Sequence, residues 1–255
     1  MPYFEIYSNN SKQLIGMRKE VVLTRENLVE CYDDIGSYGY SDGKLCYWFH
    51  SWVKNGTTAE VRPANSSIEG DVNIPSEVII DGKHYPINKI GMFHDCQKIT
   101  SIVVPDSVIH IEYGAFEDSP LIESITVSEK NDCFDSRDCC NAIIFTEFDM
   151  LVHGCKNTII PNSVRRIYNY AFGGCSGLTT IDLPESITKI GSDVFYGCDN
   201  LSTIKSHITD PSKCEVNDSA FSDITDKCIL YVPKGTIEDY RSENYWKEFK
   251  MIEEL

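Results

Sequence analysis

The chain has 255 residues, and its 39 Asp and Glu against 23 Lys and Arg give a formal net charge of −16. So acidic a chain offers little of the clustered positive charge that nucleic acids and anionic lipid surfaces require, and we expect it to bind neither. The length suffices for a substantial hydrophobic core, but no apolar run approaches the ~20 residues of a membrane span, so we expect no membrane insertion.

Two features of the sequence bear on the compartment in which the protein works. The start of the chain lacks the basic residues and apolar stretch of a secretion signal, so we expect none there. The eleven cysteines are odd in number, and no Cys-x-x-Cys pair occurs among them. In so long a chain this favours free thiols, several of them small buried hydrophobes, over a disulfide framework.

The first predicted element is a helix within residues 1–66, a region that shows no internal repeat. Thr24 is a suitable N-cap for a short amphipathic helix that ends before Gly36. Three residues would form its apolar face: Leu28, Val29 and Tyr32.

A β-hairpin is predicted next. The β-rich runs 44–53 and 57–61 flank Asn55-Gly56, a dipeptide that favours a tight turn because both residues tolerate positive φ. Together with the helix, the hairpin makes residues 1–66 a small α+β region. We expect this region to cover the open end of the structure that follows, and a separate binding domain is the alternative.

From Asp71 onward the chain repeats itself. Two tandem units beginning at Pro161 and Pro184, 23 residues apart, share the pattern Pro-x-Ser-Val/Ile, then Ile, then Phe-x-Gly-Cys-x-x-Leu-x-x-Ile. A fixed period of this length is typical of solenoid proteins. Five phenylalanines anchor the repeats: Phe93, Phe116, Phe172, Phe195 and Phe221.

Each anchor is followed by a predicted short strand. Ile181 and Leu183 alternate with Thr180 and Asp182, so one face would be buried and the other exposed. Pro184 then ends the strand because it has no N–H to donate to a ladder. Stacked coils of this kind would pair their strands as a parallel sheet around an interior filled by the anchor rings. The buried positions recur in the other repeats as Ile102, Val104, Ile125, Val127, Ile204, Leu230 and Val232.

Two segments interrupt the period. In the first, Asp81-Gly82 predicts a small hairpin. The second, residues 128–160, would pair residues 142–145 with residues 150–152 as another hairpin. Such an insertion is either a protruding binding loop or a loop that the solenoid merely tolerates, and the sequence favours neither.

Residues 236–255 are predicted to form a helical cap. Thr236-Ile-Glu-Asp239 has the spacing of a capping box, which opens a helix. Four apolar residues would cover the last coil: Tyr240, Trp246, Phe249 and Ile252.

The repeats resemble the BspA-type leucine-rich repeats, whose consensus is close to I-x-I-P-x-S-V-x-x-I-G-x-x-A-F-x-G-C-x-x-L. Ile190-Gly191 and Phe195-Tyr-Gly-Cys198 match it almost letter for letter, and the resemblance covers roughly residues 70–255. A long variant repeat and an ending found in family members from gut and oral bacteria also have counterparts here, at residues 135–144, 154–158 and 230–236.

The resemblance implies a mainly β, right-handed leucine-rich-repeat solenoid with a parallel sheet. With the regions predicted above, the chain would divide into an N-terminal cap or small α+β region at residues 1–66, repeats at 67–235 with the long insertion at 128–160, and a helical cap at 236–255. Family members are mostly cell-surface proteins implicated in adhesion to host or matrix proteins, and they share no catalytic residues. The resemblance therefore implies a surface or secreted module, although the visible start of the chain carries no signal.

Chemical signals in the sequence are weak. Five residues of types that bind zinc lie within one stretch: Cys133, Cys139, Cys140, His153 and Cys155. Their spacing matches no pattern of paired ligands, so core thiols and loop residues are favoured, and we expect no metal or other cofactor. His153 and Cys155 would face the same way on a strand, but no third group orients them as base and nucleophile. No phosphate-binding loop or nucleophile elbow occurs.

The sequence thus favours a non-catalytic protein-binding or adhesion module. Its contact surface would be the outward row of the strands: Ser101, Val103, Ser124, Thr126, Thr180, Asp182, Thr203 and Lys205. A structural spacer or array element is the second hypothesis, because Ser and Thr are ordinary residues on exposed strands. The third is an enzyme with a site where residues 1–66 meet the repeats, which would need polar groups to converge around Glu26, Glu30, His50 and Trp52.

Overall fold

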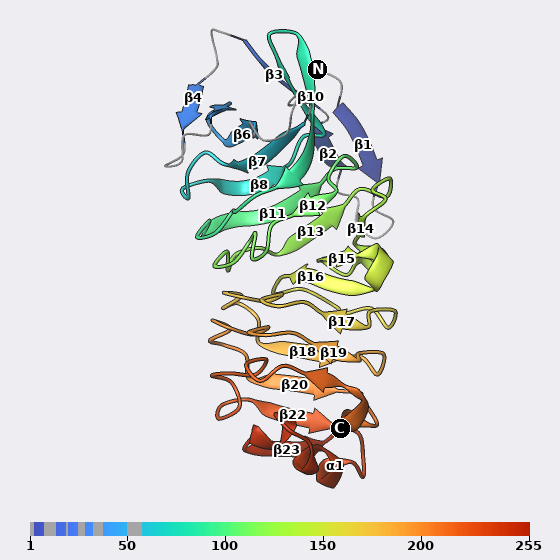
Figure 1. The fold of residues 1–255 in the computed structure, drawn as a ribbon. Coiled ribbons are helices and arrows are strands. Elements are labelled where there is room, and N and C mark those ends of the chain that lie inside the picture. The colour runs from blue at the N-terminus through green and yellow to red at the C-terminus, as the bar shows by residue number, and fades with distance from the viewer. Residues whose placement is uncertain (1–2, 8–13, 19, 25–28, 33–37, 50–57) are drawn as a thin grey trace.

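The computed structural model describes residues 3–7, 14–18, 20–24, 29–32, 38–49 and 58–255. Within them the fold is mainly β, with one short α-helix and four short 3-10 helices. The strands lie one above the next along an elongated molecule, with α1 (Ile237–Ser242) at the end away from the N-terminal strands (Figure 1). The expectation of a mainly β repeat fold is confirmed.

The N-terminal strands pair mostly antiparallel. They are β1 (Tyr3–Tyr7), β2 (Leu14–Arg18), β3 (Glu20–Leu23), β4 (Val29–Tyr32), β5 (Tyr38–Ser41), β6 (Leu45–Phe49) and β7 (Ala59–Pro63). β6 and β7 form the predicted hairpin, although its Asn-Gly turn lies outside the described residues. β7 also pairs parallel with β10 (Lys83–Ile90), so this region joins a sheet of the repeats.

The helix predicted after Thr24 is wrong where the structure describes it. Residues 25–28 and 33–37 lie outside the description, but Val29–Tyr32 is strand β4, paired antiparallel with β5. A β-branched and an aromatic residue suit a strand that has cross-strand partners. Pairing between segments therefore outweighs the local capping signal here.

The repeat strands lie on two sides of the stack. One side holds β8 (Glu69–Asn73), β11 (Lys98–Val104) and β13 (Ser124–Val127), and further along β18 (Thr180–Leu183), β20 (Thr203–Ser206), β22 (Ile229–Val232) and β23 (Met251–Glu254). The other side holds β10 with β12 (His110–Ile111), then β16 (Met150–Gly154), β17 (Arg166–Ile167), β19 (Lys189–Ile190) and β21 (Glu215–Val216). These strands pair parallel along each side, as expected, but the hairpins make the sheets of the chain mixed. The handedness of the coil stays a prediction.

The anchor phenylalanines form the interior of the stack. All five are between 0 and 3% exposed. The Phe195 ring stacks on Phe172 at 5.7 Å and on Phe221 at 6.1 Å, with interplanar angles of 15° and 10°. Two residues after each anchor the backbone turns with positive φ, a conformation that Gly and Asp tolerate best. These turn residues are Asp95, Asp118, Gly174, Gly197 and Asp223.

Both hairpins predicted within the repeats are confirmed. β9 (Glu77–Ile80) pairs antiparallel with β10 across Asp81 and Gly82, whose φ angles are 49° and 76°. In the longer insertion, β15 (Ala142–Phe145) pairs antiparallel with β14 (Phe134–Asp135) and with β16. The 3-10 helices η1 (Arg137–Cys139) and η2 (Thr146–Phe148) connect these strands.

The β15–β16 hairpin lies inside the stack, between β13 and β17 (Figure 1). Ile143 belongs to the core that contains Phe116, whereas Ala142 and Ile144 belong to the core that contains Phe172. All three side chains are fully buried. Of the two interpretations of the insertion, a protruding loop is therefore wrong for these strands.

The C-terminal segment packs on the last anchor. Trp246 of η4 (Trp246–Glu248) and Phe249 lie 4.9 Å and 5.1 Å from the Phe221 ring. The predicted helix forms as α1, after η3 (Pro211–Lys213) and β22, but the capping box does not. The Thr236 hydroxyl instead donates to Pro233 O at 2.7 Å. The segment also holds a strand that was not predicted, because β23 pairs parallel with β22.

Candidate functional site

Four of the eight predicted face residues form a compact group. The pairing of β18 with β20 places Thr180 beside Thr203 and Asp182 beside Lys205. Thr180 and Asp182 are exposed, and Lys205 Nζ lies 3.7 Å from Asp182 Oδ1. An exposed ion pair of this kind adds little stability. The group is thus a small polar surface with balanced charge.

The other four predicted residues lie on β11 and β13, in a different sheet. Ser101 pairs with Ser124 and Val103 with Thr126. The Ser101 hydroxyl donates to Asp71 Oδ1 at 2.6 Å. Val103 is only 5% exposed, so it is covered and offers a partner little surface.

The long insertion separates these two groups. β13 and β18 belong to different sheets, and the segment after β16 lies against the start of β13. There Lys156 Nζ is 2.6 Å from Glu123 Oε1, and Asn157 Nδ2 donates to Glu123 O at 3.1 Å. The eight predicted residues therefore do not share one continuous face.

Sequence reasoning missed the extension of the β18–β20 surface. Ile229 and Tyr231 of β22 continue its two rows, followed by Met251 and Glu253 of β23. The alternation around Leu230 would have indicated the first two. No repeat pattern occurs in β23, so nothing in the sequence indicated that Met251 and Glu253 belong to this surface.

A groove of about 590 Å³ runs along the turns that follow the anchors. Its lining includes Tyr196 and the carboxylates of Asp118, Asp199 and Asp223. Near it, burial and then the neighbouring Asp118 raise the pKa of Glu117. Sequence reasoning missed this acidic groove, although Asp or Gly recurs two residues after each anchor.

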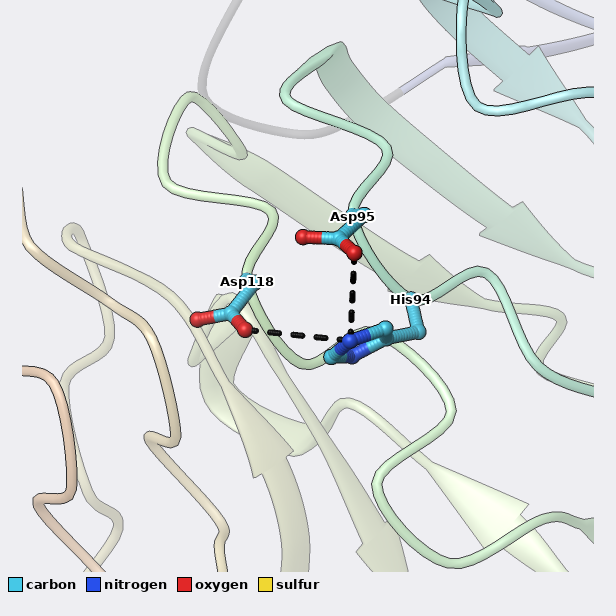
Figure 2. Close-up of side chains that lie close together, drawn as sticks. All are labelled: His94, Asp95 and Asp118. Atoms are coloured by element: carbon cyan, nitrogen blue, oxygen red, sulfur yellow. Dashed lines mark ion pairs between the residues drawn. The ribbon is translucent and has the colours of Figure 1, made fainter.

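His94, Asp95 and Asp118 gather at the N-terminal end of this groove (Figure 2). The imidazole Nε2 lies 3.3 Å from Asp95 Oδ2 and 3.9 Å from Asp118 Oδ2. His94 and Asp95 are exposed, as surface ion pairs commonly are, and such pairs contribute little. Nothing beyond the spacing points to an ion, and we assign no metal to them.

The five residues with zinc-binding side chains do not converge. Cys140 lies in the core that contains Phe172, and Cys155 lies in the core that contains Phe116. Cys139 is exposed. Burial raises the pKa of the Cys140 thiol to about 12 and also raises that of Cys155. All ten cysteines whose side chains are described are free thiols, and eight of them are buried. The eight buried cysteines act as small core residues.

His153 and Cys155 do not form a catalytic pair in this geometry. The Cys155 thiol donates to Asn141 O at 3.4 Å, and the His153 ring packs beside Phe116. Of the residues considered for an N-terminal enzyme site, Glu26, His50 and Trp52 lie outside the described residues, and Glu30 is exposed on β4. Every helix among the described residues is too short or too polar to span a bilayer.

Comparison with protein-family models matches residues 72–147 and 147–243, in six copies, to the BspA type leucine rich repeat region. Together these stretches cover more than half of the chain. Among curated proteins no match is found.

Several solved structures are similar. A leucine-rich repeat protein from Bacteroides ovatus ATCC 8483 is 21% identical over 74% of this chain and 54% of its own, with a TM-score of 0.44. A leucine rich cell surface protein from Faecalibacterium prausnitzii A2-165 is 19% identical over 76% and 54%, with a TM-score of 0.40. A leucine-rich repeat protein from Bacteroides capillosus ATCC 29799 is 22% identical over 66% and 98%, with a TM-score of 0.36. The chain thus spans about half the length of the first two.

Proposed function

Because the chain belongs to the BspA-type leucine-rich repeat family, we propose that it is a non-catalytic module that binds other proteins. The observation that carries this proposal is the in-register pairing of β18, β20, β22 and β23, which lines up side chains from successive coils on one surface. The backbone ladders already hold in place the strands that carry these side chains. Binding a partner would therefore order side chains but no further backbone of these strands, which favours affinity.

The proposed contact surface has a polar part and an apolar part. Thr180, Asp182, Thr203 and Lys205 form the polar part, and Ile229, Tyr231 and Met251 extend it with apolar and aromatic side chains. Mixed character of this kind is typical of protein–protein interfaces, in which Tyr and Met are enriched. Ser101, Ser124 and Thr126 would belong to a second, separate contact.

The partner class in this proposal is a protein of the host or its matrix, and the location is the cell surface or the secreted fraction. Both follow from the family rather than from any contact described above. The right-handed coil and the capping roles of residues 1–66 and 236–255 belong to the same proposal.

The test is binding of the purified chain to immobilised fibronectin, fibrinogen and laminin, measured by surface plasmon resonance. The double variant Thr180→Arg/Asp182→Arg should bind at least tenfold more weakly, because two long cationic side chains would hold a partner off the surface. The matched control Thr188→Arg/Asp218→Arg changes exposed residues next to β19 and β21, on the other side of the stack, and should bind like the wild type.

Unchanged binding by the first double variant would reject the contact surface. If the wild-type chain bound none of the three proteins, adhesion to these matrix proteins would be rejected.

A further inference from the structure

His153 packs among the phenylalanine rings in the interior of the stack. His153 of β16 lies beside Phe116, with ring centroids 5.2 Å apart, and Phe116 packs on Phe93 at 5.5 Å. At the next residue, a Cβ added to Gly154 would collide with the ring of Phe172. His153 and Gly154 thus lie where the ring stacks of the two halves of the chain meet.

Packing alone does not explain a histidine at this position. The residue is 6% exposed, and among the described residues none forms a hydrogen bond with its ring nitrogens. Burial lowers the pKa of His153 to about 4, so the imidazole is neutral at pH 7. Its ring nitrogens are not among the fully buried polar atoms that lack a partner, so they are accessible to solvent from the adjoining space. A ligand that fills this space would exclude solvent from the imidazole, and it would have to supply a hydrogen bond of its own.

His153 borders a cavity of about 160 Å³ between the turn after β12 and strands β16 and β17. An engineered protein cavity of ~150 Å³ accepts one benzene ring, so this one has room for a single ring. Besides His153, the lining combines aliphatic and aromatic side chains with one carboxylate and a second, exposed imidazole: Ile111, Tyr113, Val152, Tyr168, Glu112 and His110.

The charges next to the cavity are balanced. Lys89 Nζ lies 2.5 Å from Glu112 Oε2 and 3.1 Å from Glu60 Oε2, and Arg62 also pairs with Glu60. These two cations and two carboxylates balance one another. The carboxylates of Glu117 and Asp193 also act on Tyr113 of the lining, so the surroundings disfavour an anion. The rings of Tyr113 and Tyr168 meet edge to face at 6.0 Å and 86°, which leaves aromatic surface at the lining.

We propose that this cavity binds one neutral aromatic ring that carries a hydroxyl group, that is, a phenol. The O–H would donate to the unprotonated nitrogen of His153 and so replace the hydrogen bond that solvent can give to this nitrogen. The ring would pack against Tyr113 and Tyr168 in the offset or edge-to-face arrangement that aromatic pairs prefer. A hydrocarbon ring would exclude solvent from the imidazole without giving it a hydrogen bond, and an anion would be repelled by the carboxylates near Tyr113.

The cavity borders β12, β16 and β17, whereas the proposed protein-contact surface lies on β18, β20, β22 and β23, so the two proposals stand independently. The phenol has two possible sources with the same chemistry, a free small molecule or a tyrosine side chain of a partner.

The first test is titration of the full chain with 4-methylphenol, followed by calorimetry and by the 15N shifts of the His153 imidazole. Saturable binding at millimolar concentration or below, with movement of the His153 signal, is expected. Toluene, which has the same ring and methyl group but no hydroxyl, should bind at least tenfold more weakly. Absence of saturable binding, or a His153 signal that does not move, overturns the proposal.

Variants distinguish the hydrogen bond between the phenol hydroxyl and His153 from nonspecific binding. His153→Phe should weaken 4-methylphenol binding at least tenfold without lowering the melting temperature, because phenylalanine suits the ring stack. His207→Phe, at an exposed histidine elsewhere, should bind like the wild type. Equal binding by His153→Phe and wild type overturns the proposal even if both are folded. N-acetyltyrosine amide distinguishes the sources: its binding supports a partner's tyrosine, and binding of 4-methylphenol alone supports a free phenol.

Discussion

Ile143 and Ile144 are neighbours in β15, yet their side chains belong to different hydrophobic cores. Successive side chains of a strand point to opposite faces, so this strand acts as a wall that both cores share. Most repeat strands described above bury only one face. The insertion therefore connects the two halves of the stack through side chains as well as through the backbone.

The two isoleucines can be removed one at a time. Ile143→Ala and Ile144→Ala should each destabilise the protein by about 2–5 kcal/mol, since each leaves a cavity in a closed core. Hydrogen exchange should locate the effects differently, in β11 and β13 for Ile143→Ala and in β17 and β18 for Ile144→Ala. Identical exchange maps for the two variants would contradict the separation of the cores.

The neutral state of His153 predicts a pH dependence of stability. Its folded pKa of about 4 lies below its ordinary value of 6.5, so the unfolded chain binds more protons between these values. The free energy of unfolding should therefore fall as the pH drops from about 6.5 to 4, by about 3 kcal/mol in total. Urea unfolding at pH 7 and pH 4.5 measures the change.

Other acidic groups also titrate in this range, so His153→Phe is the control. The variant should show a shallower loss of stability between the two pH values than the wild type. Parallel pH dependences of the two proteins would mean that His153 does not titrate as its burial requires.

Tyr240 of α1 explains an exception in the repeats. Ser206 occupies the position at which other coils have Val104, Val127, Leu183 or Val232, and it is fully buried. Its hydroxyl lies 2.6 Å from Tyr240 Oη, which also donates to Ile208 O at 2.8 Å. Tyr240→Phe should cost about 1–2 kcal/mol of unfolding free energy, because it leaves buried polar atoms without partners.

The double variant Tyr240→Phe/Ser206→Val measures this contact. It should be more stable than the sum of the two single changes, since valine removes the orphaned hydroxyl. Tyr231→Phe on the half-buried strand surface serves as the control and should change stability little. Additive effects in the cycle would show that the hydroxyls are not coupled.

The cysteines should differ sharply in reactivity. Burial raises the pKa of Cys175 to about 12 and raises that of Cys198 as well, whereas Cys139 is exposed. Among the ten cysteines whose side chains are described, iodoacetamide at pH 8 should therefore modify Cys139 first in the native protein, since only a thiolate that is accessible reacts. Mass spectrometry of tryptic peptides identifies the site, and equally fast labelling of Cys198 would contradict its burial. After denaturation the order should disappear.

The sequence predicts features that depend on near neighbours. The alternation from Thr180 to Leu183 requires one buried face, and Asp81-Gly82 requires a tight turn, so both could be recognised without a partner strand. Two predictions from local sequence, the helix after Thr24 and the capping box at Thr236, were wrong because other contacts form instead. Val29–Tyr32 pairs with β5, and the Thr236 hydroxyl bonds back to Pro233 O instead of capping α1.

The candidate site was predicted where the coils are regular. Thr180, Asp182, Thr203 and Lys205 meet because β18 and β20 follow each other without an interruption. The burial of Val103 was not foreseen because the period does not reveal what covers a strand. Strand β23 was not predicted because it pairs in register without a repeat motif. The place of His153 beside Phe116 depends on how the insertion folds, which no spacing in the sequence encodes.

Because β18 and β20 pair residue for residue, each coil adds the same length to the molecule. Coils that begin at Pro161 and Pro184 are 23 residues apart, and their strands align residue for residue. Duplicating residues 184–206 would move everything beyond them outward by about 4.8 Å, the spacing between neighbouring strands, and leave the contacts within each coil unchanged. The number of repeats therefore sets the length of the molecule. Duplicating or deleting the DNA that encodes one repeat would change this length by one strand spacing.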